Sequence, residues 1–221
     1  MICVVGIELS CSPLREGYDG RVPPSTRALP ARSARQSSPS TLRSDAERNR
    51  LTILAAATEA LTEIGLDVPV DEIARRAGVG SATIYRRFPT RDDLLVAALE
   101  ERVRDYADLV ERALEEADPW RAFCDLLYAV CERQAADAGF RDLLAATKWP
   151  PVSIGEHSQR AADGVARLVR RAKRAGALRK DFASGDVRFL MMANGGITRS
   201  AADPAVWKRH IEYVIDGLRA R

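Results

Sequence analysis

A short segment after residue 80 combines small, aromatic and basic side chains at spacings that place them on one face of a helix. Ile84 and Phe88 form an apolar stripe that a helix of about 3.6 residues per turn would bury. The opposite and flanking positions are Ser81, Ala82, Thr83, Tyr85 and Arg86. Small residues at the start of such a helix permit close approach, and arginine and tyrosine reach bases or phosphates. The pattern is typical of a helix that enters the major groove of DNA.

The residues on either side of this segment predict the elements that would position it. Residues 70–77 predict a first short helix with an apolar inner face, and Gly78 can adopt the left-handed conformation that reverses the chain. Pro89 ends the second helix, and Thr90 predicts the N-cap of a long helix. Residues 70–88 therefore fit a helix-turn-helix, although a helical corner with solvated arginines explains the same pattern.

The charge of this region gives mixed support for a nucleic-acid partner. The chain has 34 Lys and Arg against 31 Asp and Glu, a formal net charge of +3. Residues 45–95 instead carry seven basic and nine acidic side chains, whereas nucleic-acid-binding domains are usually basic. The local excess of acid favours a second interpretation, a helical small-molecule-binding or adaptor protein without specific DNA binding.

Helical periodicity and capping residues continue to the end of the chain and predict an all-α fold. A capping-box pattern at Ser44 predicts the start of the first of three short helices, and Asp118 and Asp203 each precede a proline at a helix start. Later helices are expected over residues 119–136, 140–147, 156–175, 184–199 and 204–219. We expect three parts: a flexible tail (1–43), a helix-turn-helix domain (44–92) and a larger helical domain (93–221).

The predicted tail differs from the rest of the chain in composition. Residues 10–44 are rich in serine, proline and arginine and cannot bury enough apolar surface to fold. Three interpretations stay open: a solvated tail, the product of a misassigned start codon, or an arm that reaches a DNA minor groove.

Residues 45–99 resemble the DNA-binding domain of the TetR family of bacterial transcriptional regulators. The resemblance rests on the segment VDEIARRAGVGSATIYRRFPTRDDLL, with its IA…AGV turn, its T.IY..F helix and a basic link into the long helix. It implies a homodimer whose second short helices enter successive major grooves of a palindromic operator in double-stranded DNA. It also implies contacts to bases (Ser81, Ala82), to phosphates or base edges (Thr83, Tyr85, Arg86, Arg87) and to the DNA backbone (Arg91). Val70 and Ala82 depart from the residues most common in the family.

The resemblance implies that the C-terminal domain binds a ligand and forms the dimer, so we expect a repressor that a small apolar molecule releases from DNA. The preferred pocket residues are Tyr106, Phe123, Leu127, Trp149, Phe189 and Met192, with Phe140 and Met191 as further candidates. All of these residues also fit an ordinary core. The expected dimer interface lies on the last two helices and includes Gly195, Trp207, Ile211, Val214 and Leu218.

The sequence lacks the motifs of the common enzyme and cofactor sites. It contains no GxxxxGK[ST], HExxH or GxSxG pattern. The histidines His157 and His210 have no metal-ligand spacing with Cys124 or Cys131, which we expect to be buried thiols. We therefore expect no catalytic residue, no cofactor and no metal. No apolar run suits a transmembrane helix or a signal peptide, so we expect a cytoplasmic protein without a membrane partner.

Overall fold

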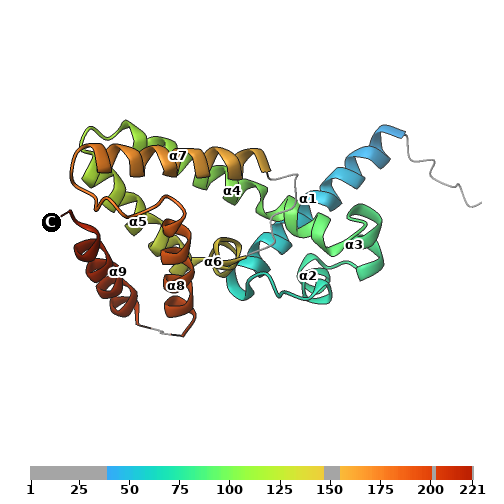
Figure 1. Cartoon of the computed structure of the whole chain (residues 1–221). Helices are drawn as coiled ribbons and strands as arrows, with labels where there is room; N and C mark the ends of the chain where they lie inside the picture. The colour runs from blue at the N-terminus through green and yellow to red at the C-terminus, as the bar shows by residue number, and fades with distance from the viewer. Residues whose placement is uncertain (1–38, 147–154, 201–202, 221) are drawn as a thin grey trace, which may run out of the picture. The chain divides into compact units, whose positions relative to one another are not determined.

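The computed structural model describes residues 39–146, 155–200 and 203–220, and these residues form nine helices (Figure 1). In chain order the helices are α1 (Pro39–Ile64), α2 (Val70–Ala77), α3 (Ser81–Arg87), α4 (Arg91–Glu115), α5 (Pro119–Ala136), α6 (Ala138–Ala145), α7 (Gly155–Arg174), α8 (Asp186–Ser200) and α9 (Pro204–Leu218). The described residues form no strand, only an isolated antiparallel bridge between Leu178 and Arg219. The all-α prediction is confirmed. Residues 1–38, most of the predicted tail, lie outside the described residues.

The first helix begins earlier than the sequence predicts. α1 starts at Pro39 rather than Ser44 and is 26 residues long, so it is not a short helix. Proline is tolerated in the first turn of a helix, and no helix breaker separates Pro39 from Ser44. The other predicted caps are confirmed, because Asp118 and Asp203 accept hydrogen bonds from the first turns of α5 and α9.

One apolar cluster joins α1 to α2, α3 and the first half of α4. We call it the N-terminal cluster; its buried residues lie between Ile53 and Leu99. The turn between α2 and α3 is made by Gly78, whose φ of 66° is a left-handed conformation that favours glycine. Because α3 contributes only Ile84 and the following Phe88 to this cluster, most of its remaining surface stays open.

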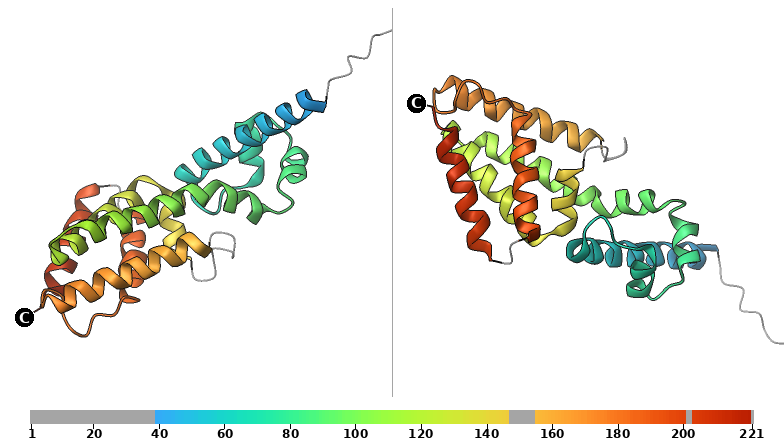
Figure 2. Two further views of the ribbon diagram at one scale, coloured as in Figure 1. Left: turned by 90° about the horizontal axis from the view of Figure 1, so that it is seen from above. Right: turned by 60° about the horizontal axis from the view of Figure 1, so that its bottom comes forward.

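A second apolar cluster fills the bundle formed by the rest of α4 and by α5–α9. We call it the C-terminal cluster; its buried residues lie between Val103 and Leu218. α4 and α7 run side by side, and α5 packs against α7, α8 and α9 (Figure 2). The Phe123 and Phe182 rings meet edge to face, with 5.8 Å between their centroids. Burial of such large side chains supplies about 1.5–3 kcal/mol each, so this cluster holds the bundle together.

The two clusters share α4. Leu99 belongs to the N-terminal cluster and Val103, one turn later, to the C-terminal cluster. α2 and α3 lie at one end of the described helices and α9 at the other (Figure 1). A continuous helix thus connects the two ends, and the domain limits proposed from the sequence stay a prediction.

Candidate functional site

The face of α3 that points away from the N-terminal cluster is accessible. Ile84 is 1% exposed, whereas Tyr85 is 46% exposed and Ala82, Arg86 and Arg87 are also exposed. This is the orientation that the apolar stripe predicts. Arg86 donates a hydrogen bond through Nη2 to Thr83 Oγ1 at 2.9 Å, which orients its guanidinium along the same face.

The first residue of α3 already has a polar partner. The Ser81 hydroxyl donates a hydrogen bond to Asp71 Oδ1 at 2.6 Å and is half-buried. A base or phosphate that approaches Ser81 therefore meets a carboxylate as well. This contact makes Ser81 less available than the exposed side chains further along α3.

The acidic side chains of α1 and α2 are largely neutralised by arginines of the same two helices. Glu72 accepts hydrogen bonds from Arg75 Nη2 at 2.7 Å and from Arg76 Nε at 2.8 Å, and these bonds lower its pKa to about 2. Arg76 also pairs with Glu63 at 2.7 Å. Arg86 and Arg87 have no carboxylate partner among the described residues. Within residues 45–95 the exposed arginines without a carboxylate partner therefore lie on α3, although the region as a whole is acidic.

Arg91 is hydrogen-bonded to backbone carbonyls of its own chain. Its Nη2 donates to the carbonyl oxygens of Leu66 and, at 3.1 Å, Val68, and its side chain is half-buried. The guanidinium therefore supports the loop between α1 and α2. A role on the DNA backbone, expected from the sequence, does not follow from this placement.

A cavity of about 600 Å³ opens in the bundle between α4, the end of α6, α7 and the start of α8. Its described lining is mostly apolar and includes Val103, Leu143, Val165 and Met191. This volume lies within the range of about 300–1,000 Å³ that is usual for small-molecule sites.

The predicted pocket residues are only partly found at this cavity. Tyr106 and Phe189 line it, as does Met191 from the wider set of candidates. Phe123 and Leu127 are each 1% exposed in the C-terminal cluster and do not line it, because both side chains are packed inside the closed part of that cluster. Met192 follows the lining residue Met191 but does not line the cavity, and Trp149 lies outside the described residues. The polar lining residues Ser158, Ser184 and Arg188 could not be predicted from the apolar pattern of the sequence.

Most of the predicted interface residues face the core of their own chain. Trp207, Ile211 and Leu218 are at most 8% exposed and belong to the C-terminal cluster, and Val214 is partly buried against it. Gly195 is buried where a Cβ would lie 3.2 Å from Arg141 Cγ. The apolar stripe of α9 is thus explained by intrachain packing, and an interface on this helix would use its other face.

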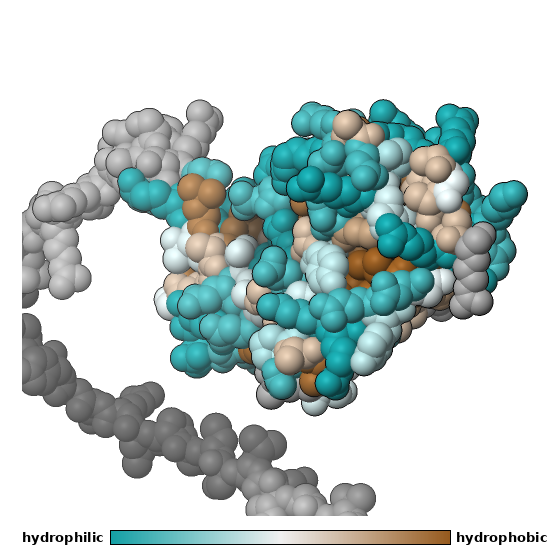
Figure 3. Space-filling model, turned by 90° about the vertical axis from the view of Figure 1, so that its left-hand side faces the viewer, coloured by the Kyte–Doolittle hydropathy of each residue, from teal (hydrophilic) through white to brown (hydrophobic). Residues whose placement is uncertain are grey.

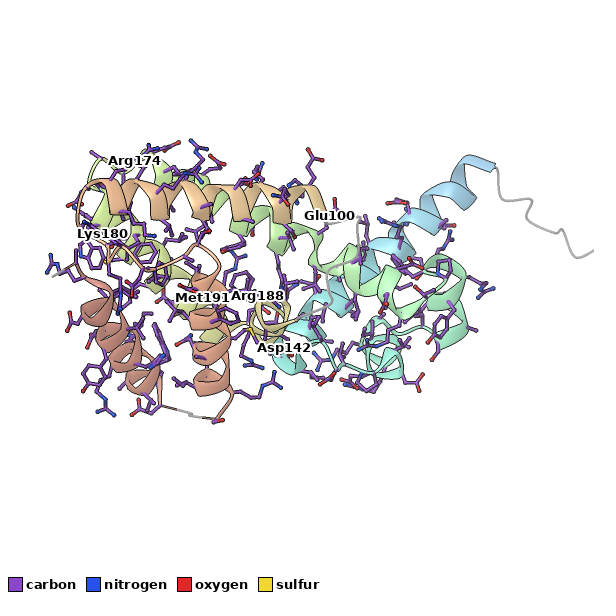
Figure 4. All side chains as sticks on the ribbon, in the orientation of Figure 1. Glu100, Asp142, Arg174, Lys180, Arg188 and Met191 are labelled. Atoms are coloured by element: carbon purple, nitrogen blue, oxygen red, sulfur yellow. The ribbon has the colours of Figure 1, made fainter. Side chains whose placement is uncertain are left out.

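Two buried polar residues connect the bundle to α1 and the loop after it. Arg102 donates through Nε to Asp137 Oδ2 at 2.6 Å and through Nη2 to Thr58 O at 3.0 Å. Asp142 accepts a hydrogen bond from the Leu66 backbone N–H at 3.1 Å and pairs with Arg199 at 2.5 Å. Figure 4 labels Asp142 on α6, close to α1.

Two family models match most of the described chain. Residues 53–98 match the model of the bacterial regulatory proteins of the tetR family, and residues 118–220 match the SbtR-like C-terminal domain of transcriptional regulators. An HTH-type transcriptional regulator of Mycobacterium tuberculosis is 30% identical over 142 residues, which cover 62% of this chain and 71% of that protein. The chain belongs to the TetR family. It is therefore grouped with transcriptional regulators and not with enzymes.

Two other comparisons cover different shares of the chain. The HTH-type transcriptional repressor LfrR of Mycolicibacterium smegmatis is 41% identical over 73 residues, 33% of this chain and 36% of LfrR. The crystal structure of RolR in complex with resorcinol covers 80% of this chain and 91% of RolR, with 17% identity and a TM-score of 0.54. This second likeness concerns the fold alone.

The described residues also show where the thiols lie and whether a metal-ligating cluster or a membrane-spanning helix is present. Cys131 is buried and Cys124 half-buried, both are free thiols, and burial raises the pKa of Cys131 to about 12. In the described ranges, no group of three or more His, Cys, Asp and Glu side chains is arranged to hold a metal ion. No helix in the described part of this TetR-family chain is long and apolar enough to span a membrane.

Proposed function

We propose that this TetR-family protein is a homodimeric repressor that binds a palindromic operator through α3 and leaves it when a small apolar molecule occupies the cavity. The observation that carries the proposal is the accessible face of α3. Ala82 there permits close approach to base edges, while Tyr85, Arg86 and Arg87 supply donors for bases and phosphates. LfrR, which is 41% identical to this chain over 73 residues, is named a transcriptional repressor.

The cavity supports the second half of the proposal. It lies between helices of the bundle, is open to the surface on one side and is lined mainly by apolar side chains, as small-molecule sites usually are. RolR, which shares the fold, is named with resorcinol as its ligand. A ligand shifts a regulator between two states only through its different affinity for them, so the cavity must be coupled to the position of α3.

Neighbouring residues on α4 and α6 supply such a coupling. Val103 lines the cavity, and the preceding Arg102 is hydrogen-bonded to Thr58 and Thr62 of α1. Leu143 lines the cavity, and the preceding Asp142 holds the N–H of Leu66. A ligand that displaces either wall of the cavity also displaces a polar group bonded to α1 or to the loop that follows it.

The dimer is proposed to form through the outer faces of α8 and α9. Tyr213 of α9 is 68% exposed, and Gly196 of α8 has open space where a side chain would project. Seen from the end that carries α9, the surface is mostly hydrophilic with small separate hydrophobic areas (Figure 3). An interface there would therefore be mixed in polarity, with Tyr213 as an aromatic anchor.

Selection of bound DNA from a random pool tests the proposal. The expected result is a palindrome whose half-site centres lie about one helical turn, ~34–36 Å, apart. The double variant Tyr85→Ala/Arg86→Ala should enrich no sequence, while Arg75→Ala, whose guanidinium is already paired with Glu72, should enrich the same palindrome. No enrichment by the wild type would contradict DNA recognition and favour the adaptor interpretation.

A further inference from the structure

The described lining of the cavity carries a positive charge and no negative one. Among the described lining residues, Arg188 is the one charged side chain, and no Asp or Glu is present. The other polar groups are uncharged and come from Tyr106, Ser158 and Ser184. The site therefore offers an unbalanced positive charge next to an apolar space.

A hydrogen bond holds Arg188 at the rim of the cavity. Its Nη2 donates to the carbonyl oxygen of Ala146 at 2.8 Å, and Ala146 follows the last residue of α6 and lines the cavity itself. Figure 4 shows Arg188 and Met191 where α8 meets α6. A guanidinium carries several N–H donors in a planar fork, so one bond to Ala146 leaves others to bind an acceptor.

The interior of the cavity suits an uncharged group. Val103, Leu143 and Met191 present apolar walls, and the Tyr106 ring packs edge to face on Phe140 with 5.7 Å between centroids. Burial raises the pKa of Tyr106 to about 12, so its phenol remains neutral at physiological pH and adds no charge to the interior.

We propose, on the basis of the ligand-binding cavity above, that the ligand is an apolar molecule with a single anionic group, such as a carboxylate, paired with Arg188. The apolar body occupies the space beside Val103, Leu143 and Met191, where burial supplies most of the affinity. The carboxylate accepts charge-assisted hydrogen bonds from the guanidinium at the rim, which orient the molecule. A neutral analogue loses these bonds, and a cationic analogue meets a like charge.

Matched probes of one size and three charges test this assignment. We would titrate the purified full-length protein with decanoate and decylamine below their micelle-forming concentrations and with decanol below its solubility limit, and measure binding by calorimetry. Naphthoate and naphthalenemethanol form a second, aromatic pair that distinguishes a flat ligand from a linear one. Decanoate or naphthoate should bind at least tenfold more tightly than its neutral partner.

Two substitutions of Arg188 test whether its positive charge determines the preference for an anion: Arg188→Met removes the charge, and Arg188→Lys keeps it. Arg188→Met should weaken carboxylate binding at least tenfold and leave alcohol binding unchanged, whereas Arg188→Lys should retain most of the preference for the anion. Arg170→Met is the matched control, because Arg170 is exposed on α7 and does not line the cavity. Ala162→Trp, at an exposed lining position, should block all probes and so localise binding to the cavity.

Three outcomes would overturn the inference. Equal affinity for the carboxylate and the alcohol, or carboxylate binding unchanged in Arg188→Met, would reject the anionic class while leaving the cavity as a ligand site. Binding of no probe to the wild type would reject the anionic class and the ligand-binding half of the proposed function together. The DNA-binding half is judged separately by the selection experiment.

Discussion

The region around α3 and the bundle around the cavity both contain arginines that lack a carboxylate partner in the described part of the chain, but the surroundings of these arginines differ. Arg86 and Arg87 project from an exposed helix face, whereas Arg188 stands at the rim of an apolar cavity. In both places the arginines lack a carboxylate partner among the described residues, while Arg75 and Arg76 of α2 are bound to Glu72. The comparison teaches that the net charge of a region does not show which of its basic side chains are free to bind a partner, because paired and unpaired arginines lie on neighbouring helices.

Truncating a residue in the closed core of the bundle should lower the free energy of unfolding more than truncating a residue that lines the cavity. Phe123→Ala removes a ring that is 1% exposed, so the free energy of unfolding should fall by about 3–5 kcal/mol. Phe189→Ala removes a ring that is 65% exposed at the cavity and should change it by no more than about 0.5 kcal/mol. Urea unfolding of both variants measures the difference, and equal losses would remove the distinction between core and cavity.

The next largest effect should come from the polar connection between the two regions. Arg102→Met removes the cation paired with Asp137 and one of the donors to the carbonyl of Thr58, so the free energy of unfolding should fall by about 3 kcal/mol. Arg104→Met, on the exposed side of the same helix, should have little effect. Unfolding monitored by circular dichroism tests both, and an unchanged Arg102→Met protein would show that these bonds do not hold α1 to the bundle.

Operator binding should separate the paired arginines of α2 from the unpaired ones of α3. Arg86→Ala should weaken binding by about 1–3 kcal/mol if its guanidinium reaches base edges. Arg75→Ala, whose side chain is bound to Glu72, should weaken it much less. Fluorescence anisotropy with the selected operator measures both affinities. If both variants lost the same amount of operator affinity, the absence of a carboxylate partner would not explain why Arg86 binds DNA.

Dimer formation should depend on the outer face of α9 and not on the exposed face of α4. Tyr213→Arg should raise the dimer dissociation constant about tenfold, since exposed tyrosines are frequent anchors of interfaces. Glu100→Arg, an exposed change on α4 (Figure 4), should leave it unchanged. Sedimentation equilibrium gives both constants, and the opposite order would move the interface to another face.

The smallest expected effect is the pH dependence of the ion pairs on α2. The pKa of Glu72 is lowered from 4.5 to about 2 by its hydrogen bonds from Arg75 and Arg76. Their contribution to stability is therefore present at neutral pH and is lost as the pH falls through the range from 4.5 to about 2. Thermal melts should show a difference between wild type and Glu72→Gln that shrinks over this range. Glu59→Gln, an exposed control on α1, should show no such trend.

The accessible face of α3 could be predicted from the sequence because local rules determine it. The spacing of Ile84 and Phe88 and the left-handed Gly78 place the exposed side chains without knowledge of the bundle. The roles of Trp207 and Phe123 could not be predicted in this way, since an apolar stripe does not reveal whether core, ligand or partner covers it. Arg188 was missed because its significance depends on the neighbouring end of α6, distant in sequence.

Photo-crosslinking from α3 tests the central claim most directly. Tyr85 would be replaced by an azido-phenylalanine, the variant bound to the selected operator, and the cross-linked nucleotides mapped; the same replacement at Tyr213 is the control. The account predicts adducts at symmetric positions in both half-sites from residue 85 and none from residue 213. Operator binding without any adduct from residue 85 would show that this face of α3 does not contact DNA.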